Sequence, residues 1–178
     1  MAMITYKNIE RPEVTAALFD GFDRYQEVKK CWRKIGGAWI LKDIAFIEQW
    51  NEQEYAYLAQ CLRRTLETGG AVVGAFTDGG LVGFASVEGR VFGGEQMYVQ
   101  LSSLHVSYGR RGEGIGKALF ARACSHARKL GAKKLYISSH SAEETQAFYK
   151  SVGCVEAAEY DAALTAAEPC DCQLEYLL

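Results

Sequence analysis

The second half of the chain alternates between strand-like and helix-like patterns of hydrophobic residues. Strands are predicted at 96–107 and at 134–138. Between them, apolar residues recur every four positions over 115–130 and Gly131 follows, which predicts a helix and its end. Strands joined by a helix indicate a layered α/β domain with some parallel pairing.

The end of the chain adds one more helix and two closing strands to this prediction. Ser141 and Glu144 have the spacing of a capping box, so a helix is expected to begin there and to end at Gly153. The segments 154–160 and 172–178 are predicted to be strands.

The first half of the chain is rich in aromatic residues and less regular. A short strand is predicted at 4–9, and Pro12 suits the first turn of a helix with an apolar stripe. The segment 27–41 centres on Gly36-Gly37, which favours a hairpin, with a broken helix as the alternative.

Two further elements complete the first half. Apolar residues at helical spacing predict a helix over 50–68, which Gly69 ends. The runs 71–76 and 81–87 flank a Thr-Asp-Gly-Gly turn, and this combination is a strong signal for a β-hairpin.

Length and composition limit the classes of protein to which this chain can belong. Its 178 residues suit one domain, 1–178, and 49% hydrophobic with 24% charged residues is typical of globular folds. A formal net charge of −2 offers no basic footprint, so no nucleic-acid partner is expected. With neither a long apolar run nor a signal-peptide pattern, we expect no membrane partner and a cytoplasmic location.

The six cysteines are scattered along the chain, and without an export signal they are interpreted as reduced thiols. Only Cys170 and Cys172 lie close together. Their one-residue spacing is not that of a zinc site, so no metal is expected and the pair is assigned to a terminal strand.

The most informative segment is the glycine-rich turn between strand 96–107 and helix 115–130. It contains Arg110-Arg111-Gly112-Glu113-Gly114-Ile115-Gly116-Lys117. Unpaired amides and the positive end of the helix dipole make such a turn a natural phosphate site. Glycines let the chain approach a phosphate closely, and Arg110 or Arg111 adds charge. A tight turn without a ligand is the alternative.

Single residues exclude two nucleotide-binding motifs. A Walker loop ending at Lys117 needs Gly, and then Ser or Thr, where Arg111 and Ala118 stand. A Rossmann fingerprint needs glycine where Lys117 or Leu119 stands. Neither ATP nor NAD is therefore the expected ligand.

The pattern that does fit, Arg111-x-x-Gly114-x-Gly116, resembles the signature of the GNAT family of N-acetyltransferases. The preceding Leu104-His105-Val106 resembles the family's central strand. The segment 147–154, Ala-Phe-Tyr-Lys-Ser-Val-Gly-Cys, resembles its last helix, and the resemblance covers about residues 70–160.

The resemblance implies a fold and a ligand. The fold is an α/β domain whose twisted, mostly antiparallel mixed sheet is flanked by helices and has a splayed central strand pair. The ligand is acetyl-CoA, a co-substrate, with its pyrophosphate on the loop amides and its pantetheine arm along the strand. Ser141 stands where many relatives have Asn, which puts one common coenzyme contact in doubt. The residues implied to bind acetyl-CoA are Leu104, Val106, Arg110, Arg111, Gly112, Gly114, Ile115, Gly116, Lys117, Ser141 and Tyr149.

Acetyl transfer from a thioester needs a neutral amine, donors for the carbonyl oxygen and a proton for the departing thiolate. The resemblance assigns the oxygen to the Val106 amide and the proton to Tyr149. The base stays open between His105, which has a suitable intrinsic pKa but faces away from its strand neighbours, and Glu88 or Glu95, acting through water. No cysteine shows an activating partner, so direct transfer is expected.

The acceptor is expected to be a small-molecule amine, and the protein a monomer or homodimer. Trp32, Trp39, Phe46 and Trp50 either line an acceptor pocket or close the core. Acetylation of a protein lysine or N-terminus is the alternative reaction. A non-catalytic coenzyme A-binding sensor is the alternative class.

Overall fold

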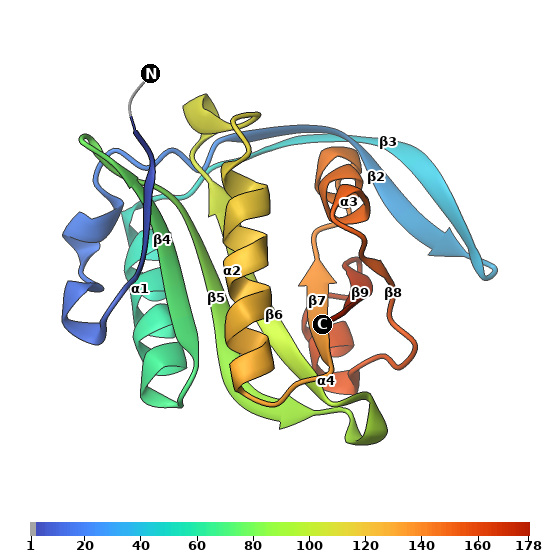
Figure 1. Ribbon diagram of the computed structural model, residues 1–178. Coiled ribbons are helices and arrows are strands. Elements are labelled where there is room, and N and C mark those ends of the chain that lie inside the picture. The colour runs from blue at the N-terminus through green and yellow to red at the C-terminus, as the bar shows by residue number, and fades with distance from the viewer. Residues whose placement is uncertain (1–2) are drawn as a thin grey trace.

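A computed structural model describes residues 3–178 and contains a seven-stranded mixed sheet, a separate two-stranded hairpin and flanking helices (Figure 1). The α-helices are α1 Glu52–Glu67, α2 Ile115–Lys129, α3 Glu143–Ser151 and α4 Ala162–Ala167. The strands are β1 Thr5–Asn8, β2 Gln26–Ile35, β3 Ala38–Glu48, β4 Ala71–Thr77, β5 Gly80–Phe92, β6 Tyr98–Val106, β7 Lys134–Ser139, β8 Val155–Glu156 and β9 Cys172–Leu177. Short 3-10 turns are η1 Arg11–Glu13, η2 Ala16–Phe19, η3 Gly94–Gln96 and η4 Tyr108–Arg110.

The strand order of the large sheet is β1-β4-β5-β6-β7-β9-β8, and its central pair is splayed. β6 and β7 form its one parallel pair among residues 3–178, and they pair only between Tyr98–Gln100 and Lys134–Tyr136. Beyond these residues the two strands separate and leave a V-shaped gap (Figure 1). This mostly antiparallel, splayed sheet confirms the fold class implied by the family resemblance.

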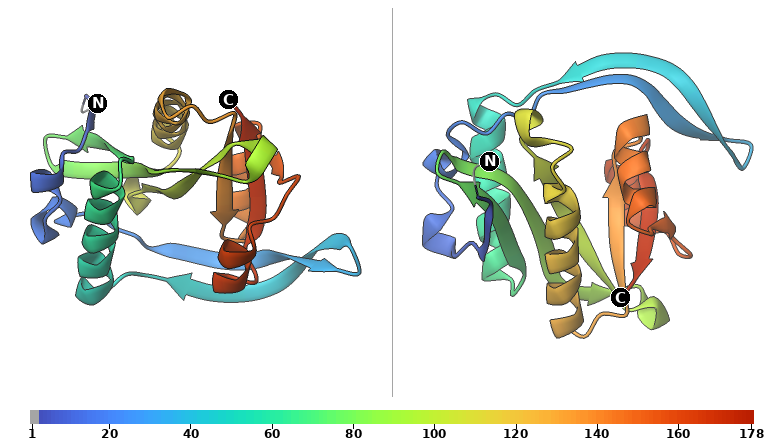
Figure 2. Two further views of the ribbon diagram at one scale, coloured as in Figure 1. Left: turned by 90° about the horizontal axis from the view of Figure 1, so that it is seen from below. Right: turned by 45° about the horizontal axis from the view of Figure 1, so that its top comes forward.

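Helices cover both faces of the sheet. Figure 2 shows α2 on one side, and α1, α4 and the β2–β3 hairpin on the other. The predicted apolar face of α2 is confirmed, because each of its four members is at most 1% exposed: Ile115, Leu119, Ala123 and Ala127. Burying such a face against the sheet stabilises the fold by about 1.5–3 kcal/mol for each large aliphatic side chain. Within residues 3–178, no helix has the length and apolar character needed to span a membrane.

The segment predicted as a hairpin is a long antiparallel β2–β3 ribbon, so the broken-helix alternative is wrong. Gly36 and Gly37 both have positive φ, +58° and +81°, as a two-residue hairpin turn requires. The ribbon runs across the open end of the V and reaches α3 (Figures 1 and 2). There the Trp32 amide donates to the Ser141 carbonyl at 2.8 Å.

Other predicted elements differ from the structure in type or length. The helix expected from Pro12 is instead the two turns η1 and η2, because Thr15 between them is extended, although Phe19 is still buried. The strand predicted at 154–160 is reduced to β8. Helix α4 was not predicted; Asp161 caps it by accepting from the Leu164 amide at 2.9 Å.

The capping box predicted at the start of α3 does not form. The N-cap residue is Ala142, and no side chain caps the helix. The Ser141 hydroxyl instead accepts a hydrogen bond from the Arg33 guanidinium at 2.7 Å, because the β2–β3 hairpin passes over this helix end.

Candidate active site

The turn before α2 presents an open row of backbone amides. Gly114 is the N-cap residue, with φ +82°, and its lack of a side chain leaves the helix end uncapped. The first intrahelical bond runs from the Ala118 amide to the Gly114 carbonyl, so the preceding amides have no helical acceptor. A Cβ atom added at Gly112 or Gly114 would meet nothing within 4 Å, which shows that this face of the loop is open.

The basic side chains of the turn have different partners. Arg110 donates two hydrogen bonds to Glu113, each 2.8 Å long, so much of its charge is balanced. Arg111 donates to the Val106 carbonyl at 3.1 Å and thereby ties the loop to the end of β6. Burial lowers the pKa of Arg111, although the group stays charged at neutral pH.

A cleft of about 520 Å³ occupies the V between β6 and β7 and extends to the start of α2. Its walls come from β6, β7, α3 and the glycine-rich turn. All of the coenzyme-binding residues predicted from the sequence line it except Ser141: Leu104, Val106, Arg110, Arg111, Gly112, Gly114, Ile115, Gly116, Lys117 and Tyr149. Ser141 is buried and holds the hairpin, so we leave it out of the proposed coenzyme site.

The backbone of β6 directs amide hydrogens into this cleft. Amides along a strand alternate between its two edges. The Ser107 amide donates to the Val82 carbonyl at 2.9 Å, toward β5, so the Val106 amide points to the opposite edge, which borders the gap. Leu104, two residues earlier, has the same orientation.

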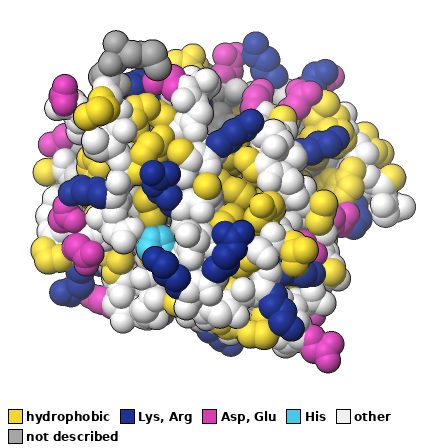
Figure 3. Space-filling model, viewed as in Figure 1, with side chains coloured by type: hydrophobic (Ala, Val, Ile, Leu, Met, Phe, Trp, Pro, Cys, Tyr) yellow, Lys and Arg dark blue, Asp and Glu magenta, His cyan; other side chains and the backbone are white. Residues whose placement is uncertain are grey.

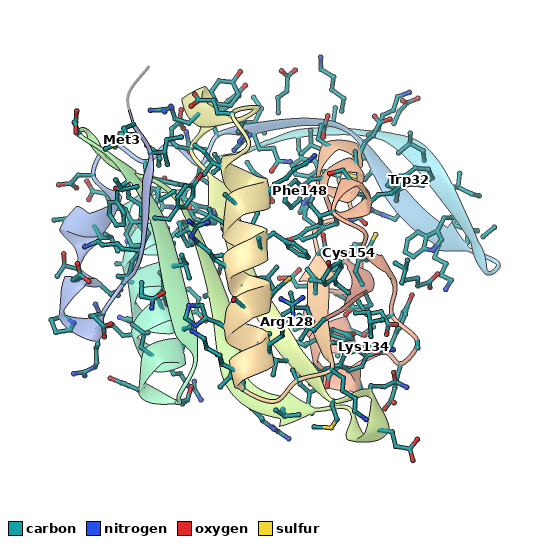
Figure 4. The ribbon with its side chains drawn as sticks, in the orientation of Figure 1. Met3, Trp32, Arg128, Lys134, Phe148 and Cys154 are labelled. Carbon is teal, nitrogen blue, oxygen red and sulfur yellow. The ribbon has the colours of Figure 1, made fainter. Side chains whose placement is uncertain are left out.

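α3 contributes two aromatic side chains to the cleft. Phe148 points from α3 toward α2 (Figure 4), and its ring would lie only 3.0 Å from a Cβ atom at Gly116. Figure 3 shows hydrophobic side chains exposed between these two helices. Gly116 is therefore required for close packing of α2 against α3.

Tyr149 lies beside Phe148 and is 7% exposed, with its ring packed edge-on against Phe148 and Phe120. Its hydroxyl has no hydrogen-bond partner among residues 3–178, and the side chain lines the cleft. Burial raises the pKa of Tyr149 well above its usual value, with smaller contributions from Cys154 and Asp171. The hydroxyl thus keeps its proton at neutral pH and is a potential donor.

His105 points to the other face of β6, as its alternation with Leu104 predicted. Its imidazole packs against the rings of Trp50 and Phe84, with centroids 4.9 and 5.4 Å away. Burial, helped by the nearby positive charge of Arg24, lowers the pKa of His105 to about 3. An imidazole of such low basicity is poorly suited to accept a proton from an amine, which argues against His105 as the base.

A second cavity, of about 960 Å³, lies on the α1 side of the sheet. Ser102, Ser103 and His105 line both cavities, so the two cavities meet at β6 from opposite faces. Of the four aromatic residues singled out in the sequence, Trp50 alone lines this cavity. Trp32 and Trp39 belong to the hairpin, and Phe46 packs against His140.

Glu88 lines the second cavity beside Ser102, one of the residues that line both cavities. The β5–β6 ladder is irregular between Val87 and Val91, and such an irregularity redirects the side chains within it. One Glu88 carboxylate oxygen accepts from the Thr65 hydroxyl at 2.8 Å and from the Ser102 hydroxyl. Glu95, by contrast, is exposed on η3 and lines neither cavity.

Thr65 and Ser102, the two hydroxyl partners of Glu88, were not among the predicted site residues. Neither residue belongs to a recognisable motif, and only the close crossing of α1 over β5 brings Thr65 to Glu88. Among residues 3–178, no three His, Cys, Asp or Glu side chains gather in an arrangement that would hold a metal ion.

Comparison with solved structures shows where this fold recurs. Nourseothricin acetyltransferase superimposes with a TM-score of 0.67 and 19% identity, covering 97% of this chain and 95% of that one. A putative streptothricin acetyltransferase from Bacillus anthracis, in complex with acetyl coenzyme A, superimposes with a TM-score of 0.69 and 13% identity, covering 99% of this chain and 97% of that one. The PaiA N-acetyltransferase from Thermoplasma acidophilum, in complex with coenzyme A, superimposes with a TM-score of 0.59 and 14% identity, covering 99% of each chain.

Sequence comparison assigns the family. No curated protein sequence matches the chain. The model of the acetyltransferase (GNAT) family matches residues 28–154, which include β6, the glycine-rich turn, α2 and α3. Since this match covers more than half of the chain, the protein belongs to the acetyltransferase (GNAT) family.

Proposed function

We propose that this enzyme transfers an acetyl group from acetyl-CoA directly to the primary amine of a small molecule. Acetyl-CoA is the co-substrate of this acetyltransferase family, and structural neighbours are complexes with acetyl-CoA or coenzyme A. The observation that carries the proposal is the meeting of two cavities at Ser102, Ser103 and His105. One cavity suits the coenzyme and leaves the other for the acceptor.

The coenzyme is assigned to the cleft between β6 and β7. Its pyrophosphate faces the amides around Gly114, where the helix dipole is positive. Its pantetheine arm lies along β6, where the amides of Leu104 and Val106 have lost a strand partner. An extended chain with amide groups restores such hydrogen bonds in the way that an added strand does.

The transfer step uses groups that the structure supplies. The amine nitrogen attacks the thioester carbonyl carbon, and the carbonyl oxygen takes up charge beside the Val106 amide. The carbon–sulfur bond then breaks with its electron pair going to sulfur, and the Tyr149 hydroxyl gives its proton to that thiolate. The proton lost by the amine passes through water to Glu88.

The shape of the second cavity supports a small acceptor. It is bounded by α1, β5, β6 and the segment after α4, with Trp50 and Tyr57 as aromatic walls. Two neighbours are named for small molecules, nourseothricin and streptothricin. A screen of amines with acetyl-CoA, following release of the coenzyme A thiol, tests the proposal. If no amine is acetylated while the coenzyme binds, the non-catalytic alternative replaces it.

We expect acetyl-CoA, but not ATP or NAD, to stabilise the protein against heat. A ligand at about 100 times its Kd contributes about 2.7 kcal/mol, which raises Tm by about 5–10 °C in a domain of this size. A thermal-shift series with the three ligands checks this. A rise with ATP or NAD and none with acetyl-CoA would show that the loop assignment is wrong.

We expect intersecting lines in double-reciprocal plots, as direct transfer in a ternary complex requires. The buried thiols support this expectation, because burial raises the pKa of Cys154 and Cys172 to about 12 and that of Cys124 to about 11. A thiol so rarely ionised is a poor nucleophile. Parallel lines, together with an acetylated cysteine found by mass spectrometry, would contradict direct transfer.

A further inference from the structure

A β-bulge on β6 brings two consecutive serines to the same cavity. Ser103 pairs with Ser86 of β5. The next pair along the ladder is Leu101 with Val87, which leaves Ser102 as the extra residue of the bulge. A bulge turns side chains out of the usual alternation between the two faces of a strand. Ser102 and Ser103 therefore both line the second cavity, and both also line the cleft proposed for the coenzyme.

The Ser102 hydroxyl takes part in a chain of hydrogen bonds. It donates its proton to a carboxylate oxygen of Glu88, and it accepts from the Ser86 hydroxyl at 2.8 Å. A hydroxyl oxygen can accept a second hydrogen bond, and that position on Ser102 has no partner among residues 3–178. Because Ser102 is exposed, this position is open to a water molecule in the cavities.

Glu88 is held from the other side by α1. The Thr65 hydroxyl donates to the same carboxylate oxygen at 2.8 Å, and Thr65 is 3% exposed, so packing fixes this contact. Glu88 forms no ion pair with any residue in 3–178. Neutral hydroxyl groups thus orient the carboxylate, and no basic side chain balances its charge.

Only one member of this chain reaches the cleft in which the thioester is proposed to bind. Glu88 lines the second cavity but not that cleft. Of the three hydroxyl groups in the chain, those of Thr65 and Ser86 also lie on the second cavity alone, whereas Ser102 lines both. A proton released beside the thioester therefore meets Ser102 before it can reach Glu88.

We propose that Ser102 relays the proton of the acceptor amine to Glu88. As the amine N–H bond breaks, a bridging water takes up that proton and gives one of its own to the Ser102 hydroxyl oxygen, whose proton moves to the Glu88 carboxylate. Water and serine end unchanged, the amine has lost one proton, and Glu88 has gained one. This inference rests on the proposed function, because it requires an amine acceptor and Glu88 as the base.

Ser102→Ala is expected to slow acetyl transfer about tenfold while leaving the affinity for acetyl-CoA, measured by calorimetry, close to that of the unchanged protein. The loss is smaller than the about 100-fold at the low end of what a general base contributes, because a further water partly replaces the hydroxyl. Single-turnover acetylation with acetyl-CoA and the best amine of the acceptor screen measures the transfer step itself.

Ser102→Thr keeps a hydroxyl at the same position and is expected to restore most of the rate. Ser102 is exposed, so neither variant should lose the fold, and a thermal melt checks this. A Ser102→Ala variant that transfers acetyl at the full rate, or a Ser102→Thr variant as slow as Ser102→Ala, would overturn the relay.

A double-mutant cycle tests whether Ser102 acts through Glu88. Glu88→Gln keeps the size of the side chain and removes the base, so we expect a loss of about 100-fold. Adding Ser102→Ala to Glu88→Gln should then cause no further loss, whereas independent effects would multiply to about 1000-fold. A multiplied loss would show that Ser102 does not deliver its proton to Glu88.

Ser103→Ala is the matched control for this coupling. Ser103 also lines both cavities, but among residues 3–178 the hydroxyl partners of Glu88 are Thr65 and Ser102. Whatever its own size, the effect of Ser103→Ala should multiply with that of Glu88→Gln. Coupling of Ser103 to Glu88 as strong as that of Ser102 would contradict a relay through Ser102.

The same variants separate this inference from the proposed function. If Glu88→Gln slows transfer and Ser102→Ala does not, the relay alone fails, and water carries the proton to Glu88 directly. If Glu88→Gln transfers acetyl at the full rate, the base assigned in the proposed function fails together with the relay. If the unchanged protein does not bind acetyl-CoA, the proposed function as a whole fails.

Discussion

Tyr149→Phe is expected to lower kcat about 100-fold, the low end of what a positioned general acid contributes. The substitution removes one hydroxyl and keeps the ring that packs between Phe148 and Phe120. Because the raised pKa of Tyr149 keeps this group protonated, the variant loses a proton donor rather than a charge. The low end applies because a coenzyme A thiolate is a tolerable leaving group and water partly replaces the donor.

The kinetic pattern distinguishes catalysis from binding. Equal falls in kcat and kcat/KM would mark an interaction made only in the transition state. A raised KM for acetyl-CoA with unchanged kcat would instead identify the hydroxyl as a binding contact, and full activity would leave Tyr149 as a packing residue. Steady-state kinetics with both substrates varied makes this measurement.

Tyr136→Phe is the matched control for this variant. The Tyr136 hydroxyl donates to Gln173 at 2.6 Å and accepts from the Asp161 amide at 2.9 Å, away from both cavities. Its loss leaves buried partners unsatisfied, at a cost of about 1–3 kcal/mol in stability. Tyr149→Phe should therefore change activity with little change in Tm, and Tyr136→Phe should do the reverse.

Gly114→Val is expected to weaken coenzyme binding strongly. Gly114 has φ +82°, a conformation that a β-branched residue adopts only with strain, and its face of the loop is open. Valine either moves the loop or places its side chain where the pyrophosphate would approach the amides. Losing two charge-assisted hydrogen bonds of about 1.5 kcal/mol each weakens binding about 100-fold, which calorimetry with acetyl-CoA measures.

Gly131→Val separates the loss of binding from the cost of strain. Gly131 follows the other end of α2, also has φ +82°, and also has nothing within 4 Å of an added Cβ atom. Both variants should lose a similar amount of stability, yet only Gly114→Val should bind acetyl-CoA more weakly. Tight acetyl-CoA binding by Gly114→Val, or equally weakened binding in both variants, would contradict the assignment of the pyrophosphate to this loop.

The elements predicted correctly are those in which local pattern and tertiary packing agree. The period of four in α2 and the Gly36-Gly37 turn of the hairpin both depend on short-range signals that the fold reinforces. The helix expected from Pro12 is absent because the chain is extended at Thr15, although Val14 and Phe19 are buried as its apolar stripe would be. The capping box at Ser141 failed because a distant hairpin uses that hydroxyl.

The cleft proposed for the coenzyme contains more of the residues singled out in the sequence than the cavity proposed for the acceptor. The glycine-rich turn and Tyr149 each lie within a short continuous motif, so the neighbouring residues in the sequence are enough to single them out. Glu88, Thr65 and Ser102 lie on three separate elements, β5, α1 and β6, and come into contact only in the folded protein. No spacing pattern in the sequence therefore predicts this contact. The low basicity of His105 also depends on distant neighbours, since burial against Trp50 and Phe84 produces it.

The β2–β3 hairpin has a consequence for solubility. Where β6 and β7 separate, each strand has an edge with unpaired backbone groups, and such edges invite pairing with other chains. The hairpin and the segment that leads into it join both sides of this opening. The Tyr108 amide donates to the carbonyl of Asp23, just before β2, and the Trp32 amide of β2 donates to the Ser141 carbonyl, each at 2.8 Å. A foreign strand would have to displace this bridge before it could enter from that face. The same ribbon that frames the cleft therefore protects the enzyme from edge-to-edge aggregation while its cleft is empty of substrate.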